Sequence, residues 1–222
     1  MTSVAERLMQ VRTNIQSACA ACERSPDEVT LVAVSKRQPD DKLREAYAAG
    51  QRDFGENYVQ EIERKQALLP ADARWHLIGH VQTNKAKKAV QTHLVHTLDS
   101  ERLGRSLGKA ARSLGRTVTT LIEVNLAREK DKDGISPSAL VDLVRASDAW
   151  EEVVVAGLMC IPPVGEGPHW FKELVALRDR LEMELGRPFP ELSMGMTEDY
   201  MPAIEMGATL VRVGTGIFGP RE

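Results

Sequence analysis

The stretch VTLVAVSKRQPDDKLREAYAAG, at residues 29–50, contains the unit that decides the fold. Its first part, 29–35, is a short run of β-branched and apolar residues, which is typical of a strand buried on both faces. Pro39 then starts a helical segment, and Gly50 ends it. The stretch therefore predicts one strand followed by one helix.

The same pattern of a strand and then a helix recurs along the chain. Further strands are predicted near 54–56, 75–78, 94–98, 119–124, 153–158, 191–193 and 209–213, and further helices at 58–69, 83–93, 101–114, 137–147, 169–185 and 198–206. Regular alternation argues for a parallel sheet, and about eight such units argue for a closed (β/α)8 barrel of the TIM type. A doubly wound open sheet is the alternative.

An additional helix is expected over residues 3–23, where apolar residues recur at helical spacing and Ser3 with Glu6 forms a capping-box pattern. Few residues follow the last predicted strand, so the eighth helix must be short or the N-terminal helix must cover that side. No linker or repeat of fixed period indicates a second unit. We therefore expect one domain over 1–222, with the helix of 1–25 packed on the barrel.

Composition limits the class of protein. The 222 residues carry 29 Lys and Arg against 32 Asp and Glu, a formal net charge of -3. That balance argues against a strongly basic nucleic-acid-binding protein, and no apolar run approaches the roughly 20 residues that span a bilayer. Nucleic-acid binding would have to rest on Lys85, Lys87 and Lys88, which fit a solvated helix face better. We expect no nucleic-acid or membrane partner, and a monomer, because no long apolar helix stripe is left over.

The three cysteines, Cys19, Cys22 and Cys160, suit a reducing compartment better than a disulfide framework, so we expect a cytoplasmic protein. A metal site would rest on His76 with His80, or on Cys19 with Cys22. The histidines straddle a predicted strand end and the cysteines lack a second pair. We therefore expect no metal ion, and small buried cysteines.

Two charged side chains at predicted strands are not explained by the packing of a barrel alone. Lys36 continues the alternation of Val32 and Val34, so it lies at the barrel mouth if the valines point inward. A lysine desolvated there is able to form a Schiff base, and a solvated strand-end lysine is the alternative. Arg212 lies within a buried strand and needs an acceptor, which is either a structural carboxylate or a ligand such as a pyridine nitrogen.

A third feature is the glycine-rich segment GTGIFG at 214–219. It matches the dinucleotide-binding pattern, but that pattern needs a following helix, strand and acidic residue, which residues 220–222 do not supply. In a barrel, the loops after strands seven and eight commonly bind phosphate, and here these are 193–197 and 214–216. Two tight turns are the alternative. Together the three features predict a site for a phosphorylated aldehyde held as an imine, with pyridoxal 5′-phosphate as the candidate.

Several motifs also resemble a known family. LVAVSK at 31–36, FGENYVQE at 54–61, WHLIGHVQTNK at 75–85, GLM at 157–159, LSMGMTEDY at 192–200 and VRVGTGIFG at 211–219 are similar, in this order, to the pyridoxal-phosphate homeostasis proteins (YggS/PROSC-like). The resemblance covers nearly the whole chain. It implies one (β/α)8 barrel similar to the N-terminal domain of alanine racemase, with one pyridoxal phosphate bound.

Carried over to this sequence, the resemblance implies roles for the matching residues. Lys36 would be the Schiff-base lysine, and Asn57 and His76 would lie by the cofactor ring. Met159 would line the pocket, and Arg212 would meet the pyridine nitrogen. The phosphate would be held by two loops, which contribute Ser193, Met194, Gly195, Met196, Thr197, Gly214 and Thr215.

Two rim motifs depart from the family pattern. Gly79-His80-Val81 stands where Gly-Pro-Leu is common, and the segment KDKD at 130–133 is more acidic than the usual Ser-Lys. Both lie at the rim, so they bear on entry to the pocket, and Lys132 would be a second lysine near the site.

The expected arginine also bears on activity, because it cannot accept the proton of the ring nitrogen and so weakens the electron sink. The resemblance implies that alanine racemases also need a second-base tyrosine and a second domain, and Tyr47, Tyr58 and Tyr200 occupy no obvious facing position. We therefore predict a carrier or regulator of pyridoxal phosphate in vitamin B6 homeostasis, with dependent apoenzymes as partners. A weak racemase-like enzyme with Lys36 as base is the alternative.

Overall fold

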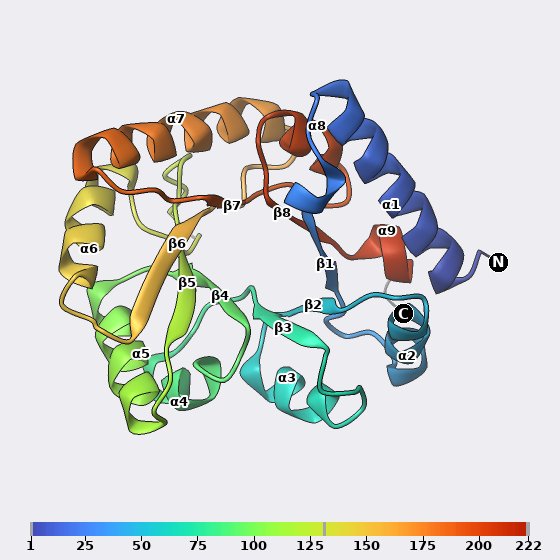
Figure 1. The fold of residues 1–222 in the computed structure, drawn as a ribbon, viewed down its shortest axis with the longest axis horizontal. Helices are drawn as coiled ribbons and strands as arrows, with labels where there is room; N and C mark the ends of the chain where they lie inside the picture. Colours follow the sequence, from blue (N-terminus) through green and yellow to red (C-terminus); the bar gives the residue numbers. More distant parts are fainter. Residues whose placement is uncertain (1, 131, 221–222) are drawn as a thin grey trace.

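The computed structural model describes residues 2–130 and 132–220. In this part of the chain, eight parallel strands lie in sequence order and close into a barrel, as predicted (Figure 1). The strands are β1 (Thr30–Val34), β2 (Asp53–Glu56), β3 (Arg74–Leu77), β4 (Leu94–Leu98), β5 (Val118–Glu123), β6 (Val153–Met159), β7 (Glu191–Ser193) and β8 (Leu210–Val213). The open-sheet alternative is wrong, because β1 pairs with β8, with Val32 opposite Arg212.

Helices surround the barrel (Figure 1). They are α1 (Val4–Ala21), α2 (Asp40–Ala48), α3 (Val59–Gln66), α4 (Ala86–Ala89), α5 (Glu101–Ser113), α6 (Leu140–Ser147), α7 (Gly167–Leu185), α8 (Tyr200–Glu205) and α9 (Thr215–Phe218), with 3-10 turns η1 (Pro26–Glu28), η2 (Thr83–Lys85) and η3 (Pro137–Ala139). The helix expected over 83–93 is much shorter than predicted. The His93 N–H bonds to the carbonyl of Trp75 and the Thr92 hydroxyl to that of Ala89, so the chain leaves the helix early.

Helix α1 covers the side of the barrel where the last helix is short. Ser3 and Glu6 form the predicted capping box. Helix α9 has four residues, and α1 packs against it, α8 and α2 (Figure 1). The buried face of α1 consists of Val4, Leu8, Val11, Ile15, Ala18 and Cys19. The two expectations for this side of the barrel are therefore both met: the helix after β8 is short, and the N-terminal helix covers the side that it leaves open.

The apolar side chains inside the barrel form a small cluster of their own, separate from the larger core between strands and helices. It consists of Val32, Leu94, Leu121, Met159 and Leu210. Because Val32 points inward and side chains alternate along a strand, Lys36 follows β1 on the inward-facing side. The chain thus carries this lysine to the mouth of the barrel.

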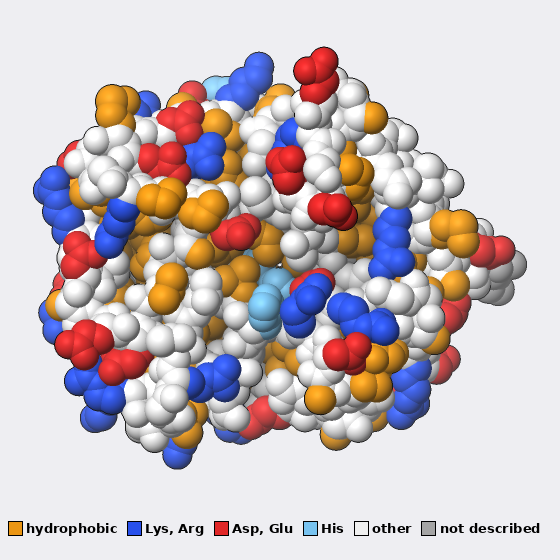
Figure 2. Space-filling model, in the orientation of Figure 1, with side chains coloured by type: hydrophobic (Ala, Val, Ile, Leu, Met, Phe, Trp, Pro, Cys, Tyr) orange, Lys and Arg blue, Asp and Glu red, His pale blue; other side chains and the backbone are white. Residues whose placement is uncertain are grey.

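The surface mixes charges of both signs, and the face in Figure 2 shows acidic and basic side chains interspersed. Lys87 and Lys88 of α4 are exposed, and Lys88 pairs with Glu63 of α3 at 2.5 Å. Cys19 and Cys160 are buried, Cys22 is half-buried, and all three are free thiols. Among the described residues, no helix combines the length and the apolar character that crossing a membrane requires.

Barrel closure depends on a glycine in β6. A Cβ atom on Gly157 would lie 1.8 Å from the carbonyl oxygen of Glu191 in β7, which no movement of a side chain relieves. We expect Gly157→Ala to lower the free energy of unfolding by about 3 kcal/mol, measured by urea denaturation. Gly108→Ala in α5 is the matched control, because its Cβ would approach Val153 only to 3.6 Å. Equal stability of the two variants would contradict this account.

Candidate functional site

Lys36 lies where the carboxyl ends of three strands meet. It follows β1, whose neighbours are β2 on one side and β8 on the other. Its Nζ donates to Oδ1 of Asn57, just after β2, at 3.4 Å, and both residues are half-buried. On the other side, Gly214 follows β8, and its backbone lies against Val34. The lysine is thus placed between the two loops in which the sequence predicted partners.

The loops after β7 and β8 meet at the hydroxyl of Thr197. The backbone N–H groups of Gly214 and Gly216 each point to Thr197 Oγ1 at 3.4 Å, and the hydroxyl of Thr215 lies 3.2 Å from it. Two amides and two hydroxyls therefore converge on one small region. A concave group of donors of this kind suits a phosphate. A Cβ on Gly216 would lie 2.9 Å from the Val213 side chain, so glycine is required there.

The predicted residues of the β7 loop do not all face this region. Gly195 adopts a φ of +88°, and a Cβ there would lie 2.6 Å from that of Ala203. The side chain of Met194 packs in the core between strands and helices. The N–H of Met196 donates to Asp199 Oδ1 at 2.7 Å, so it is engaged within its own turn. Thr197 is therefore the residue of this loop that contributes to the cradle.

Arg212 is buried in the barrel, with only 4% of its surface exposed. Its Nη1 donates to Ser193 Oγ at 2.5 Å and its Nη2 to the carbonyl of Cys160 at 2.9 Å. Burial lowers the pKa of the guanidinium, while negative charges that include that of Glu123 oppose this shift. Of the two acceptors expected from the sequence, a directly paired structural carboxylate does not occur among the described residues. Neutral oxygens hold the guanidinium instead.

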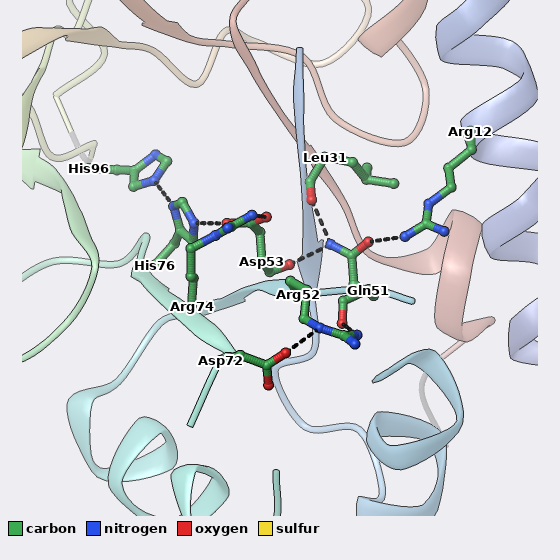
Figure 3. A network of polar contacts seen from close by, with 9 residues as sticks. All are labelled: Arg12, Leu31, Gln51, Arg52, Asp53, Asp72, Arg74, His76 and His96. Carbon is green, nitrogen blue, oxygen red and sulfur yellow. Dashed lines mark hydrogen bonds and ion pairs between the residues drawn. The ribbon is translucent and has the colours of Figure 1, made fainter. Parts of the chain in front are cut away.

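A chain of hydrogen bonds continues from Ser193 through the barrel. His96 Nδ1 lies 2.9 Å from Ser193 Oγ, and His96 Nε2 lies 3.0 Å from His76 Nδ1. His76 Nε2 is 3.0 Å from Asp53 Oδ1. Arg74 donates to both oxygens of Asp53, at 2.7 and 2.5 Å. Figure 3 shows this lower part of the chain, from His96 to Arg74. The chain links the amino-terminal end of the barrel to the side chain that holds Arg212.

Arg212 at one end and Asp53 at the other determine which groups donate and which accept along this chain of hydrogen bonds. An arginine only donates, so Ser193 Oγ accepts from Arg212 and gives its own proton to His96 Nδ1. His96 then donates from Nε2 to His76, and His76 donates from Nε2 to the carboxylate of Asp53. Burial lowers the pKa of His96 well below its usual value, as a neutral ring requires. Burial opposes ionisation of Asp53, but hydrogen bonds from Arg74 and His76 hold its pKa well below its usual range.

His76 takes part in this chain of hydrogen bonds. The resemblance placed His76 by the cofactor ring, whereas its own hydrogen bonds go to Asp53 and His96, and it reaches Ser193 only through His96. Sequence reasoning did not single out His96. The available signal was its place in the buried strand 94–98, on the same face as Leu94.

Sequence reasoning also missed a buried ion pair behind Lys36. Lys65 of α3 reaches Glu56 at the end of β2 with Nζ to Oε1 at 2.6 Å, and both side chains are almost completely buried. Ser35 joins them, because its hydroxyl donates to the same Glu56 oxygen at 2.6 Å and its carbonyl accepts from Lys65 at 2.7 Å. This cluster fixes the backbone of the residue that precedes Lys36.

The opposite part of the rim is acidic. Glu123, at the end of β5, is 6% exposed, and burial together with the charge of Asp133 raises its pKa to about 7. Lys132, expected as a second lysine near the site, is exposed and forms an ion pair with Glu129 at 2.6 Å. Lys132 also approaches the carbonyl of Pro162, at 3.5 Å. The amine of Lys132 is therefore bound to other groups of the rim.

The geometry agrees with comparisons to known proteins. A family model described as alanine racemase, N-terminal domain, matches residues 7–222. A pyridoxal phosphate homeostasis protein of Aquifex aeolicus (strain VF5) is 41% identical over 223 residues, which cover 98% of each chain. That of Escherichia coli (strain K12) is 39% identical over 233 residues, which cover 100% of this chain and 98% of the relative.

Solved structures give the same result. PipY of Synechococcus elongatus PCC7942, with PLP bound, has a TM-score of 0.86 and 38% identity over 98% of this chain and 100% of its own. An alanine racemase of Clostridium difficile 630 has a TM-score of 0.74 at 11% identity, over 94% of this chain and 55% of that one, and shows the fold alone. The fold and these matches define an alanine-racemase-type barrel. Within that class, the chain belongs to the family of pyridoxal phosphate homeostasis proteins.

The hydrogen-bond chain makes His96 important for stability. Replacing it leaves the hydroxyl proton of Ser193 and Nδ1 of His76 without their hydrogen-bond partner inside the barrel, so we expect His96→Leu to lower the free energy of unfolding by about 3 kcal/mol in urea denaturation. His93→Ala is the control, because that ring is exposed and only contacts His76 edge-on. The control should change stability by less than about 0.5 kcal/mol. A His96 variant as stable as this control would contradict the role of the chain.

The raised pKa of Glu123 predicts a dependence of stability on pH. Its carboxyl ionises near 4.5 in the unfolded chain and at about 7 in the folded one, so stability falls as the pH rises between these values. Glu123→Gln removes this loss. The stability of the variant relative to wild type should therefore grow by about 3 kcal/mol over this range and then level off. Denaturation at a series of pH values measures the difference, with the exposed Glu205→Gln as control, and a flat difference for Glu123→Gln would refute it.

Proposed function

We propose that this protein binds pyridoxal 5′-phosphate at the carboxyl ends of β1, β2, β7 and β8, and acts in vitamin B6 homeostasis as a carrier or regulator. One observation carries the proposal: a lysine and a cradle of amides and hydroxyls follow adjacent strands of one barrel. The family name and the PLP-bound structure of PipY, at 38% identity, support it.

The residues present fit this cofactor. Its phosphate needs several donors that approach closely, and Thr197, Thr215 and the amides of Gly214 and Gly216 provide them without an intervening side chain. When bound, the cofactor supplies an aldehyde that reacts reversibly with amines and a ring that stabilises negative charge. Arg212 and Ser193 lie at the neighbouring strands and offer fixed polar groups to that ring.

Lys36 supplies the amine that would hold the cofactor as a Schiff base. The Nζ of Lys36 would hold the cofactor through its aldehyde carbon, and the condensation would release one water molecule. Asn57 Oδ1 accepts from Nζ at 3.4 Å and so orients the lysine. Since the bond is reversible, a second amine can take the cofactor over, which is what delivery to an apoenzyme requires.

Two features favour a carrier over a dedicated catalyst. Arg212 cannot take a proton from the ring nitrogen, so it does not support the protonated ring that stabilises carbanions best. In addition, Tyr47 donates its hydroxyl to Asp72 at 2.5 Å, and the hydroxyl of Tyr200 accepts from Asn14 at 2.9 Å. Tyr58 is 57% exposed at the rim. Tyr47 and Tyr200 are thus engaged with other side chains, which favours a carrier over an enzyme that uses either of them as a second base.

A spectroscopic titration tests the proposed site. Wild-type protein should develop a visible absorption band with pyridoxal 5′-phosphate, and Lys36→Ala should not. Lys132→Ala is the matched control at the rim and should keep the band. Thr197→Val should bind pyridoxal phosphate at least tenfold more weakly while its weaker binding of pyridoxal, which lacks the phosphate, stays unchanged. A band that survives Lys36→Ala would refute the assignment.

Turnover of L-alanine separates the carrier from the racemase-like alternative. We expect no racemisation above the rate of free pyridoxal phosphate. Racemisation by wild type that is lost in both Lys36→Ala and Tyr58→Phe would favour an enzyme in which these two residues act as bases.

A further inference from the structure

A second group of polar side chains lies at the rim, outside the proposed cofactor site. His80 follows β3, Asp99 follows β4, and Asp133 lies in the loop after β5. His80 Nδ1 is 3.0 Å from Asp99 Oδ2 and 3.5 Å from Asp133 Oδ1. One donor atom from each residue lies within 4.8 Å of the others. His80 thus contacts two carboxylates, whereas His76 bonds to Asp53 and His96.

A fourth group, the carboxyl of Glu123, lies beside this cluster. Glu123 is more than nine-tenths buried, with 6% of its surface exposed. Its Cγ would be 3.1 Å from a Cβ on Gly134, so its side chain lies against the backbone next to Asp133. The charges of Asp133 and Asp99 both act on it. Within residues 2–130 and 132–220, no hydrogen bond or ion pair engages the Glu123 carboxylate oxygens.

The cluster has an excess of negative charge. In the described part of the chain, no lysine or arginine forms an ion pair with Asp99, Asp133 or Glu123, and His80 is the cationic partner available to the first two. The nearby Lys132 pairs with Glu129 instead. Asp99 and Asp133 share one imidazole, and the positive charge that acts on the Glu123 carboxyl beside them is that of Arg212. The cluster of His80, Asp99 and Asp133 is therefore short of positive charge, which a bound cation would supply.

We propose that His80, Asp99 and Asp133 bind a divalent transition-metal ion, with Glu123 as the buried carboxylate beside it. A mixed set of imidazole and carboxylate donors suits Zn²⁺ or Mn²⁺ better than Mg²⁺ or Ca²⁺. Ligand atoms at about 2.0–2.1 Å from a tetrahedral Zn²⁺ lie about 3.3 Å from one another. The separations of 3.0 and 3.5 Å around His80 Nδ1 already bracket that value.

The position of the cluster fits a functional ion. It lies at the carboxyl ends of the strands, where barrel proteins place their sites. His80 and Asp133 also line a cavity of about 440 Å³ that reaches Asn57. The proposal does not depend on the cofactor, because none of the three ligands belongs to the proposed cofactor cradle.

A second group of potential ligands at the amino-terminal end of the barrel is a weaker candidate. Asp53, His76 and His93 also bring donor atoms within 4.8 Å of one another. There, however, Arg74 already neutralises Asp53 through two hydrogen bonds of 2.7 and 2.5 Å (Figure 3). A divalent cation would have to displace that arginine, whereas the rim cluster holds no such competitor.

Calorimetry on metal-free protein, without pyridoxal phosphate, tests the proposal with Zn²⁺ and Mn²⁺ as probes. Wild type should bind one Zn²⁺ ion per chain. His80→Ala and Asp133→Asn should each weaken binding at least tenfold, and His93→Ala should not change it. Thermal unfolding of each metal-free variant establishes that it is folded, and Asp99→Asn provides a third variant at the same cluster.

Two results would overturn the assignment. One is the absence of stoichiometric binding by wild type, in which case the cluster is only an ion pair between His80 and two carboxylates. The other is binding that survives His80→Ala but is lost in His93→Ala, because the ion would then belong to the amino-terminal group.

Discussion

The interior of this barrel is organised by one permanently charged group, the guanidinium of Arg212. A charge in that position has no water to solvate it, so the protein must surround it with fixed acceptors. Ser193 and the carbonyl of Cys160 provide them. Ser193 accepts from Arg212 and gives its own proton to His96, and the same donor–acceptor order continues through His76 to Asp53. Strands on opposite sides of the barrel thereby depend on one another.

This constraint gives the proposed cofactor site a buried, hydrogen-bonded floor beneath a rim that is formed by loops. Arg212 and Ser193 are buried and hydrogen-bonded, and Glu56 with Lys65 fixes the backbone just before Lys36. The groups that would contact a ligand's phosphate, in contrast, lie in short loops around Thr197. Such a division suits reversible binding, because the ring side is preorganised while access from solvent remains open.

The sequence predicts the strands well because each is a short buried run bounded by turn residues, and the closed barrel follows from their regular alternation. Lys36 could be placed at the mouth from the alternation of its strand, and the glycine-rich loops indicated a phosphate cradle. Helix α4 was overpredicted, because the pairing of His93 with Trp75 is a contact between distant segments. For the same reason, the sequence did not reveal the roles of His96, Lys65 and the His80 cluster. Their partners come from other strands and loops, which periodicity within one segment cannot reveal.

The central claim is that Lys36 is the residue that holds the cofactor. The most direct measurement is borohydride reduction of the protein loaded with one equivalent of pyridoxal 5′-phosphate, followed by mass spectrometry of its peptides. The account predicts that the reduced cofactor is recovered on the peptide that contains Lys36. Recovery on Lys132, or a spread over exposed lysines such as Lys87 and Lys88, would contradict it.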